Sequence, residues 1–154
     1  MKIDDLDIKL LRLLQLDASL TFQQLADLTH ASVPTCQRRV TRLRSAGVIQ
    51  KIVAVLSPDL VKSQLTAILE VTLTSQDAET VGRFAMAMAS VDALQQCYRV
   101  STGPDFVLIV TVSDMPAYHD FAQRHLTAVN SVRNVRTFFC IDRVKFDTAI
   151  PLPH

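Results

Sequence analysis

The sequence has few features of a secreted or membrane-embedded protein. No apolar run approaches the roughly eighteen residues of a transmembrane helix, and the start, Met-Lys-Ile-Asp-Asp, lacks the apolar core of a signal peptide. Its three cysteines, Cys36, Cys97 and Cys140, are odd in number and far apart, which favours reduced, packed thiols over disulfides or a metal site. We therefore expect a cytoplasmic protein that has no contact with a membrane.

A set of catalytic residues is also missing. Ser101, Thr102 and Asp105 could suggest hydrolysis, but no histidine is placed to activate the serine and no second carboxylate could act as its partner. His119 and His125 fall on different sides of the helix expected there, which argues against a metal pair. We expect no catalytic residues, no metal and no cofactor. The alternative, a small metabolic enzyme with a ferredoxin-like domain, would need a catalytic constellation that we do not find.

Positive charge is concentrated in the first third of the chain. The 154 residues carry a net charge of +1, with eight Lys/Arg against five Asp/Glu in residues 1–56 and eight against ten in the remainder. No carboxylate occurs between Asp27 and Asp59, so the basic stretch favours an anionic partner. A hydrophobic content of 49% suffices for one large core or two small ones. We predict two domains, at residues 1–57 and 58–154, with Ser57-Pro58 in the linker.

The first domain has the pattern of a winged helix-turn-helix. Thr21 and Gln24 have the spacing of a capping box, and Ser32 can cap a further helix that Gly47 ends. The short connection before Ser32 is typical of a helix-turn-helix. We predict helices at residues 4–17, from Thr21 to His30 and from Ser32 to Ala46, followed by a strand at Val48–Val55 that would form the wing.

The third of these helices can present a basic face to DNA. Cys36, Val40 and Leu43 recur at i, i+4 and i+7, so one side can be buried while the arginines project from the other. In helix-turn-helix docking the front of the second helix meets base edges and other side chains grip phosphate. We predict base contacts from Thr35, Gln37 and Arg38, and phosphate contacts from Ser32, Arg39, Arg42 and Arg44.

Two alternatives to this interpretation of the arginines remain. An arginine-rich helical face is often only solvated, and an assembly or corepressor protein could sense metabolites without touching DNA. The capped preceding helix, the short turn and the retained arginines together favour binding to double-stranded DNA.

The second domain alternates between strand and helix patterns. Thr66–Thr74 alternates apolar and polar residues, and Phe106–Val112 is a nearly unbroken apolar run suited to a central strand. The full series is predicted as a strand at Thr66–Thr74, a helix at Asp77–Val91, strands at Leu94–Val100 and Phe106–Val112, a helix capped by Asp114, and a strand at Val135–Val144. This βαββαβ order predicts a ferredoxin-like domain and an α+β protein overall.

The chain resembles the Lrp/AsnC family of feast/famine regulators from Ile3 to about Phe146. The resemblance rests on the opening Ile3–Leu11, on the helix segment Ser32–Val40 followed by Leu43 and Gly47-Val48-Ile49, and on Ser113–Tyr118 after the central strand. It implies an amino-acid-responsive transcription regulator that is not an enzyme. By similarity, the second domains would pair through their sheets into homodimers that assemble further, commonly to octamers.

The resemblance also implies where a small amino-acid effector would bind, between dimers. The residues concerned are Ser101, Thr102, Gly103, Pro104 and Asp105 in one loop, with Val135 and Thr137 on the last strand. The family often has two threonines on that strand, and Val135 replaces one of them, which makes the site more apolar. We therefore expect leucine or methionine to bind better than asparagine, glutamine or lysine.

Overall fold

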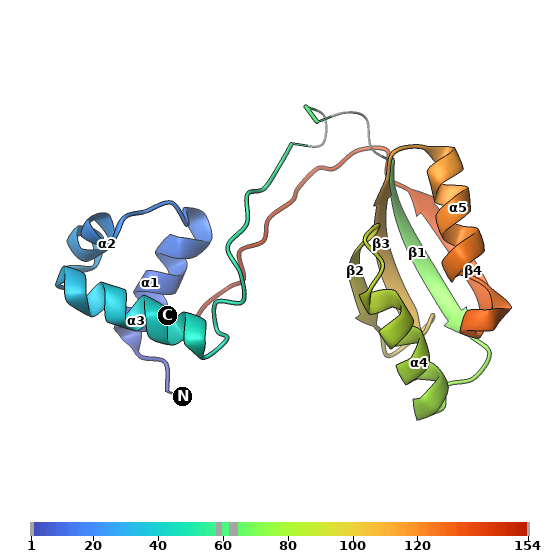
Figure 1. The fold of residues 1–154 in the computed structure, drawn as a ribbon, viewed down its shortest axis with the longest axis horizontal. Coiled ribbons are helices and arrows are strands. Elements are labelled where there is room, and N and C mark those ends of the chain that lie inside the picture. Colours follow the sequence, from blue (N-terminus) through green and yellow to red (C-terminus); the bar gives the residue numbers. More distant parts are fainter. Residues whose placement is uncertain (1, 58–59, 62–64, 154) are drawn as a thin grey trace. The chain divides into compact units, whose positions relative to one another are not determined.

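The structure is a computed structural model that describes residues 2–57, 60–61 and 65–153 (Figure 1). The chain divides into two compact units, one formed by residues 1–55 with 145–154 and the other by residues 56–144. The first unit is helical, and the second is a four-stranded sheet covered by helices. The α+β organisation predicted from the sequence is confirmed.

Three helices build the first unit: α1 (Asp5–Leu16), α2 (Phe22–Thr29) and α3 (Val33–Ser45). Each begins at a side chain that accepts a hydrogen bond from an otherwise unpaired backbone N–H of the first turn. At Thr21 the predicted capping box is complete, because Gln24 Oε1 also accepts from the Thr21 N–H at 2.8 Å. Pro34 lies in the first turn of α3, where a missing N–H breaks no helical bond.

The turn between α2 and α3 depends on one residue with a left-handed backbone. His30 ends α2 with φ 54° and ψ 38°, a conformation that histidine adopts more readily than most residues other than glycine. Ser32 then caps α3, so the two helices are joined by a three-residue connection. The three helices pack around a small buried cluster of Leu10, Leu25, Ala26, Cys36 and Val40.

The predicted wing strand does not form. Gly47 leaves α3 with φ 73°, and the N–H groups of Val48 and Ile49 donate to Leu43 O at 3.0 and 3.2 Å. Residues 50–57 continue as extended chain without strand pairing. The prediction of a strand at Val48–Val55 is therefore wrong for this chain: β-branched residues favour an extended backbone, but a strand also needs a pairing partner.

Residues 145–153 belong to the helical unit. Arg12 donates to the carbonyl oxygens of Leu152 and Pro153 at 3.4 and 2.6 Å. The Gln15 side chain donates to Ile150 O at 3.2 Å and accepts from the Ile150 N–H at 2.8 Å. This grouping differs from the predicted second domain, which extended to residue 154; the domain boundary at residues 57 and 58 stays a prediction.

The second unit has the ferredoxin-like order β1 (Leu65–Leu73), α4 (Ala78–Ala89), β2 (Leu94–Arg99), β3 (Phe106–Val112), α5 (Met115–His125) and β4 (Val132–Phe139). The sheet order is β2-β3-β1-β4, and all neighbouring strands are antiparallel. Side chains from α4 and α5 share one buried core with alternate residues of β1 and β3, so both helices cover the same face of the sheet (Figure 1).

One element boundary in this unit differs from the sequence prediction. The last strand runs from Val132 to Phe139, so the predicted segment Val135–Val144 is shifted towards the C-terminus. The helix α5 ends at His125 before a short 3-10 turn at Ala128–Asn130, which leaves Val129 exposed. The apolar residues after Phe139 continue the strand pattern of the sequence, but they have no neighbouring strand to pair with.

Candidate nucleic-acid interface and effector loop

The helix α3 separates an apolar side from a basic one. Cys36, Val40 and Leu43 are buried, as their helical spacing predicted. Gln37, Arg38 and Arg44 are exposed, and together with Thr41 and Ser45 they form the solvent side of the helix. The geometry therefore offers long polar and cationic side chains along one edge of a fixed helix, which suits contact with an anionic surface.

Ser32 and Thr35 lie at the front of α3 and bond to each other. Ser32 Oγ accepts from the Thr35 N–H at 3.4 Å, and the two hydroxyl oxygens are 2.8 Å apart. Ser32 is exposed and Thr35 is half-buried. Ser32 thus has a structural function as the cap of α3, in addition to the phosphate contact predicted for it.

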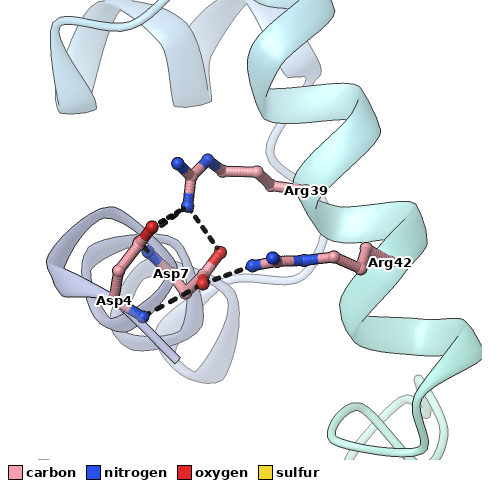
Figure 2. Close-up of polar contacts among 4 residues, drawn as sticks. All are labelled: Asp4, Asp7, Arg39 and Arg42. Atoms are coloured by element: carbon pink, nitrogen blue, oxygen red, sulfur yellow. Dashed lines mark hydrogen bonds and ion pairs between the residues drawn. The ribbon is translucent and has the colours of Figure 1, made fainter. Parts of the chain in front are cut away.

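The four arginines of α3 fall into two groups. Among the residues that the structure describes, neither Arg38 nor Arg44 makes an ion pair or a side-chain hydrogen bond, and both side chains are exposed. Arg39 and Arg42 instead point towards α1, where both reach carboxylates (Figure 2). The sequence prediction had assigned these two arginines to phosphate contacts along with Arg44.

Arg39 bridges two carboxylates near the start of α1. Its Nη1 donates to Asp4 Oδ1 and Oδ2 at 2.6 and 2.5 Å and to Asp7 Oδ1 at 3.1 Å. The hydrogen bond from Arg39, followed by that from the Asp7 backbone N–H, lowers the pKa of Asp4 to about 2. The same bonds to Asp4 and then Asp7 raise the pKa of Arg39. The pair is therefore ionised on both sides at neutral pH.

Asp7 is the centre of this cluster. Its side chain is fully buried, and its second oxygen, Oδ2, accepts from Arg42 Nη2 at 2.5 Å (Figure 2). Oδ2 also accepts from the Asp4 N–H at 3.2 Å, while Asp4 Oδ1 accepts from the Asp7 N–H at 3.0 Å. The same two carboxylates thus close the capping box of α1 and hold two arginines of α3.

No function of Asp4 and Asp7 was predicted from the sequence. The helix dipole favours negative charge in the first turn of any helix, so carboxylates there do not by themselves indicate a partner. Their i, i+3 spacing equals that of Arg39 and Arg42, and this match was the available signal. It could not reveal that the two helix faces meet, because that depends on how α1 packs on α3.

Arg38, Arg39 and Arg42 line a small cleft of about 60 Å³. Arg39 and Arg42 approach it with one nitrogen already committed to Asp7, whereas the Arg38 side chain has no such partner among the described residues. An anion at this cleft would meet Arg38 as its main unpaired cation.

The predicted effector loop is anchored to the end of β1. Gly103 has φ 90°, a conformation that glycine adopts without steric cost. The Asp105 N–H donates to Val71 O at 2.9 Å, and Asp105 Oδ2 accepts from the Leu73 N–H at 2.7 Å. Ser101 and Thr102 are exposed, and Pro104 is half-buried. Asp105 therefore keeps one carboxylate oxygen, Oδ1, that makes no hydrogen bond to the described residues.

The structure brings the loop close to one of the two predicted β4 residues. Val71 of β1 pairs with Val135 on one side and accepts a hydrogen bond from the Asp105 N–H on the other. Val135 and Asp105 therefore lie on opposite sides of β1, about 10 Å apart by the usual strand spacing. Val135 packs against the core of the unit. Thr137 lies two residues further on, with its hydroxyl 2.6 Å from the Tyr118 hydroxyl. The Thr137 hydroxyl is therefore engaged within the unit by Tyr118.

The described residues also bear on metal binding and on membrane insertion. No group of three or more His, Cys, Asp and Glu side chains has a metal-binding arrangement within those residues. None of the helices there has the length and apolar content that a bilayer-spanning segment needs.

Two protein families match this sequence. The winged helix-turn-helix DNA-binding domain matches residues 3–50, and the Lrp/AsnC ligand binding domain matches residues 66–150. The two matches cover the unit that contains α3 and the unit that contains the loop at Asp105.

Individual proteins match over nearly the whole chain. An HTH-type transcriptional regulator of Sinorhizobium fredii is 36% identical over 99% of this chain and 90% of its own length. The leucine-responsive regulatory protein of Rhizobium meliloti is 35% identical over 94% of this chain and 92% of its own. The crystal structure of a transcriptional regulator from Neisseria meningitidis in complex with L-Met has a TM-score of 0.86 at 27% identity, covering 97% of each chain. The relatives are named as regulators and not as enzymes.

Proposed function

Because this chain belongs to the Lrp/AsnC family of transcriptional regulators, we propose that it binds double-stranded DNA through α3 and responds to an amino acid held by its second unit. The chain is a transcriptional regulator with a helix-turn-helix unit and a ligand-binding domain. No chemistry on the ligand is involved. A regulator of this kind works where its operator lies, so we also assign it to the cytoplasm.

One observation carries the DNA-binding proposal: α3 is capped, packed on its apolar side and free on its basic side. Gln37, Arg38 and Arg44 are exposed on this helix, and Thr35 lies in its first turn. Arg38 can pair with guanine through two hydrogen bonds in the major groove, and Arg44 can neutralise a phosphate. We propose Thr35, Gln37 and Arg38 as base readers, and Ser32 and Arg44 as phosphate contacts.

Selection from a random DNA library with the full chain tests this proposal. We expect recovery of a sequence that repeats in two related halves, since paired helix-turn-helix units read paired half-sites. Affinity for the selected site should fall steeply with salt, as phosphate contacts require. Failure to enrich any sequence would reject DNA binding through α3.

We propose that the effector is a small apolar amino acid, best leucine or methionine. The exposed loop at Ser101–Pro104 and the unused Asp105 Oδ1 offer acceptors for a ligand ammonium, and Val135 supplies an apolar wall. The names of two related proteins, one leucine-responsive and one in complex with L-Met, support this class of ligand.

Calorimetry with single amino acids tests this part. Leucine or methionine should bind more tightly than asparagine, glutamine or lysine, and tighter binding of a polar amino acid would reject the prediction. The variant Asp105→Asn keeps an oxygen for the Leu73 N–H but removes the charge, so ligand affinity should fall about tenfold or more while DNA affinity is kept.

We further propose that second copies of the chain cover the open face of the sheet. This face lies opposite α4 and α5, and neighbouring strands bring Phe138, Ile68 and Ile109 into one apolar row across it. Ile68 is 37% exposed and Phe138 46% exposed. The adjacent row carries Glu70 with Arg136, whose ion pair measures 3.1 Å. An apolar row of this kind is typical of a dimer interface rather than of a solvated surface.

The effector would act by favouring one assembly state over another. A ligand shifts such an equilibrium only by its difference in affinity between the states, and a coupling of about 1 to 3 kcal/mol suffices. Light scattering during gel filtration, with and without each amino acid, tests this. A dimer or a larger assembly such as an octamer is expected, with a size or stability that changes with leucine or methionine. A monomer under all conditions would reject the proposal.

A further inference from the structure

We propose that Asp7, together with Asp4, fixes the position of α3 for DNA by holding Arg39 and Arg42, so that these two arginines anchor the helix and do not grip phosphate. The inference deepens the DNA-binding function proposed above and rests on it. It assigns Asp4 and Asp7 as positioning residues that act on DNA through α3.

The first support is the geometry of the bonds. The two Asp7 oxygens accept from two different arginines, Oδ1 from Arg39 and Oδ2 from Arg42 (Figure 2). Arg39 Nη1 also reaches Asp4, one turn earlier on α1. Directional, charge-assisted bonds at two points one turn apart oppose both rotation and sliding of α3 along α1.

The second support is the burial of Asp7. Its side chain is fully buried, whereas the side chains of Arg39 and Arg42 are 21% and 45% exposed. Removing one partner of such a pair leaves a buried charge without compensation. Drawing Arg42 away from Asp7 towards a DNA phosphate would therefore weaken the compensation of a buried charge, whereas Arg38 and Arg44 are available without that cost.

The third support is that an apolar residue at position 7 could stabilise the fold as well as Asp7 does. A buried ion pair often stabilises a protein no better than apolar residues of similar size, so stability alone does not explain a carboxylate at position 7. The apolar cluster between the helices, which includes Leu10 and Cys36, already holds them together. Apolar contacts have little directionality, however, and the ion pairs add an orientation that packing alone would leave less defined.

Salt titrations of DNA binding by the full chain test the inference. The affinity for the selected site and for unrelated DNA is measured for wild type, Arg42→Gln and Arg44→Gln. Arg44→Gln should flatten the dependence of log Kd on log salt by about 0.9, the value for one lost phosphate contact. Arg42→Gln should keep the wild-type slope and lower the ratio of specific to unrelated affinity by tenfold or more.

Asp7→Asn supplies the opposite test, because it removes the charge that holds Arg42, while Asp4 still holds Arg39 and Asn can still accept from the Asp4 N–H. Its salt dependence should become steeper than that of wild type, and its specificity ratio should fall at least tenfold. Asp5→Asn is the matched control: it removes one carboxylate from the same exposed turn, and Asp5 has no ion pair among the described residues. It should leave both the slope and the ratio close to wild type.

A double-mutant cycle tests the anchor without DNA. The unfolding midpoint is measured for Asp7→Asn, Arg42→Gln and the double variant, with hydrogen exchange reporting on α1 and α3. The double variant should lose less than the sum of the single losses, because the second substitution removes a charge that the first left unpaired.

The outcomes separate this inference from the function on which it rests. If Arg42→Gln flattens the salt dependence as much as Arg44→Gln does, Arg42 contacts phosphate and the inference is wrong while DNA binding stands. Additive losses in the unfolding cycle would also overturn it. A wild-type chain that selects no DNA sequence would overturn the proposed function itself.

Discussion

The two units of this chain fix their architecture by different means. In residues 56–144, called the sensor unit after its proposed function, residues such as Phe84 and Leu108 belong to one continuous apolar core between a sheet and two helices. In residues 1–55 with 145–154, called the DNA-reading unit on the same basis, the core is smaller, and a buried carboxylate with two arginines joins α1 to α3. Apolar packing between a sheet and helices is sufficient to maintain the fold of the sensor unit. Directional bonds are added where a helix must present particular side chains to a partner.

A cavity in the sensor core should produce the largest stability loss. Phe84 is 1% exposed and its ring centroid lies 4.8 Å from that of Phe106, so Phe84→Ala should cost about 3–5 kcal/mol. Calorimetric unfolding should show the loss in the sensor unit, and hydrogen exchange in α1 and α3 should stay unchanged. Faster hydrogen exchange in α3 would mean that the stability of the first unit depends on the core of the second.

Loss of one base-reading arginine should affect recognition but not the fold. Arg38→Ala removes an exposed side chain that has no partner among the described residues, and it should cost about 1–3 kcal/mol of discrimination if Arg38 pairs with guanine. Competition between the selected site and its single-base variants measures this. Unchanged affinity at several salt concentrations would show that α3 docks in another orientation.

Removal of a helix cap should have a smaller effect, confined to the DNA-reading unit. Thr21→Ala deletes the oxygen that accepts from the Gln24 N–H and should cost about 1 kcal/mol of unfolding free energy. Thr21→Ser keeps that oxygen and serves as the control. If both variants lose the same amount, the capping bond is not the cause.

The smallest effect should be an acid-dependent loosening of α1 against α3. The pKa of Asp4 is about 2 in the folded chain, below its ordinary value of 3.8, so its bond to Arg39 contributes above pH 3.8 and is lost as the pH falls towards 2. The protection of amides in α1 and α3, measured against the intrinsic exchange rate at each pH, should therefore fall between about pH 5 and about pH 2.5. The variant Asp4→Asn should show a smaller change with pH than wild type. An equal change in both proteins would exclude Asp4 as its source.

Local signals in the sequence predicted most of the fold. The caps at Thr21 and Ser32 and the alternation in β1 depend on residues a few positions apart, and the structure confirms each of them. The segment Val48–Val55 is rich in the β-branched residues that favour strands, yet it is not a strand, because pairing depends on a distant partner. Docking of residues 150–153 on Arg12 and Gln15 gave no signal, since the groups involved at 150–153 are backbone atoms.

The candidate site was predicted less completely than the fold. The spacing of Cys36 and Val40 identified the buried side of α3, and hence its exposed arginines. It did not separate Arg38 from Arg42, because both lie away from the apolar stripe. Only the packing of α3 on α1 assigns Arg42 to Asp7. Residue types and spacing thus predicted where the candidate interface lies. Which of its arginines bond to α1 and which remain exposed could be determined only from the tertiary structure.

Arginine-selective chemical modification, mapped by mass spectrometry with and without the selected DNA, tests the central claim most directly. The account predicts that Arg38 and Arg44 react readily in the free chain and are protected by DNA. Arg39 and Arg42, held by Asp4 and Asp7, should react slowly in both conditions. Rapid modification of Arg42 in the free chain, or reaction of Arg38 that saturating DNA leaves unchanged, would contradict it.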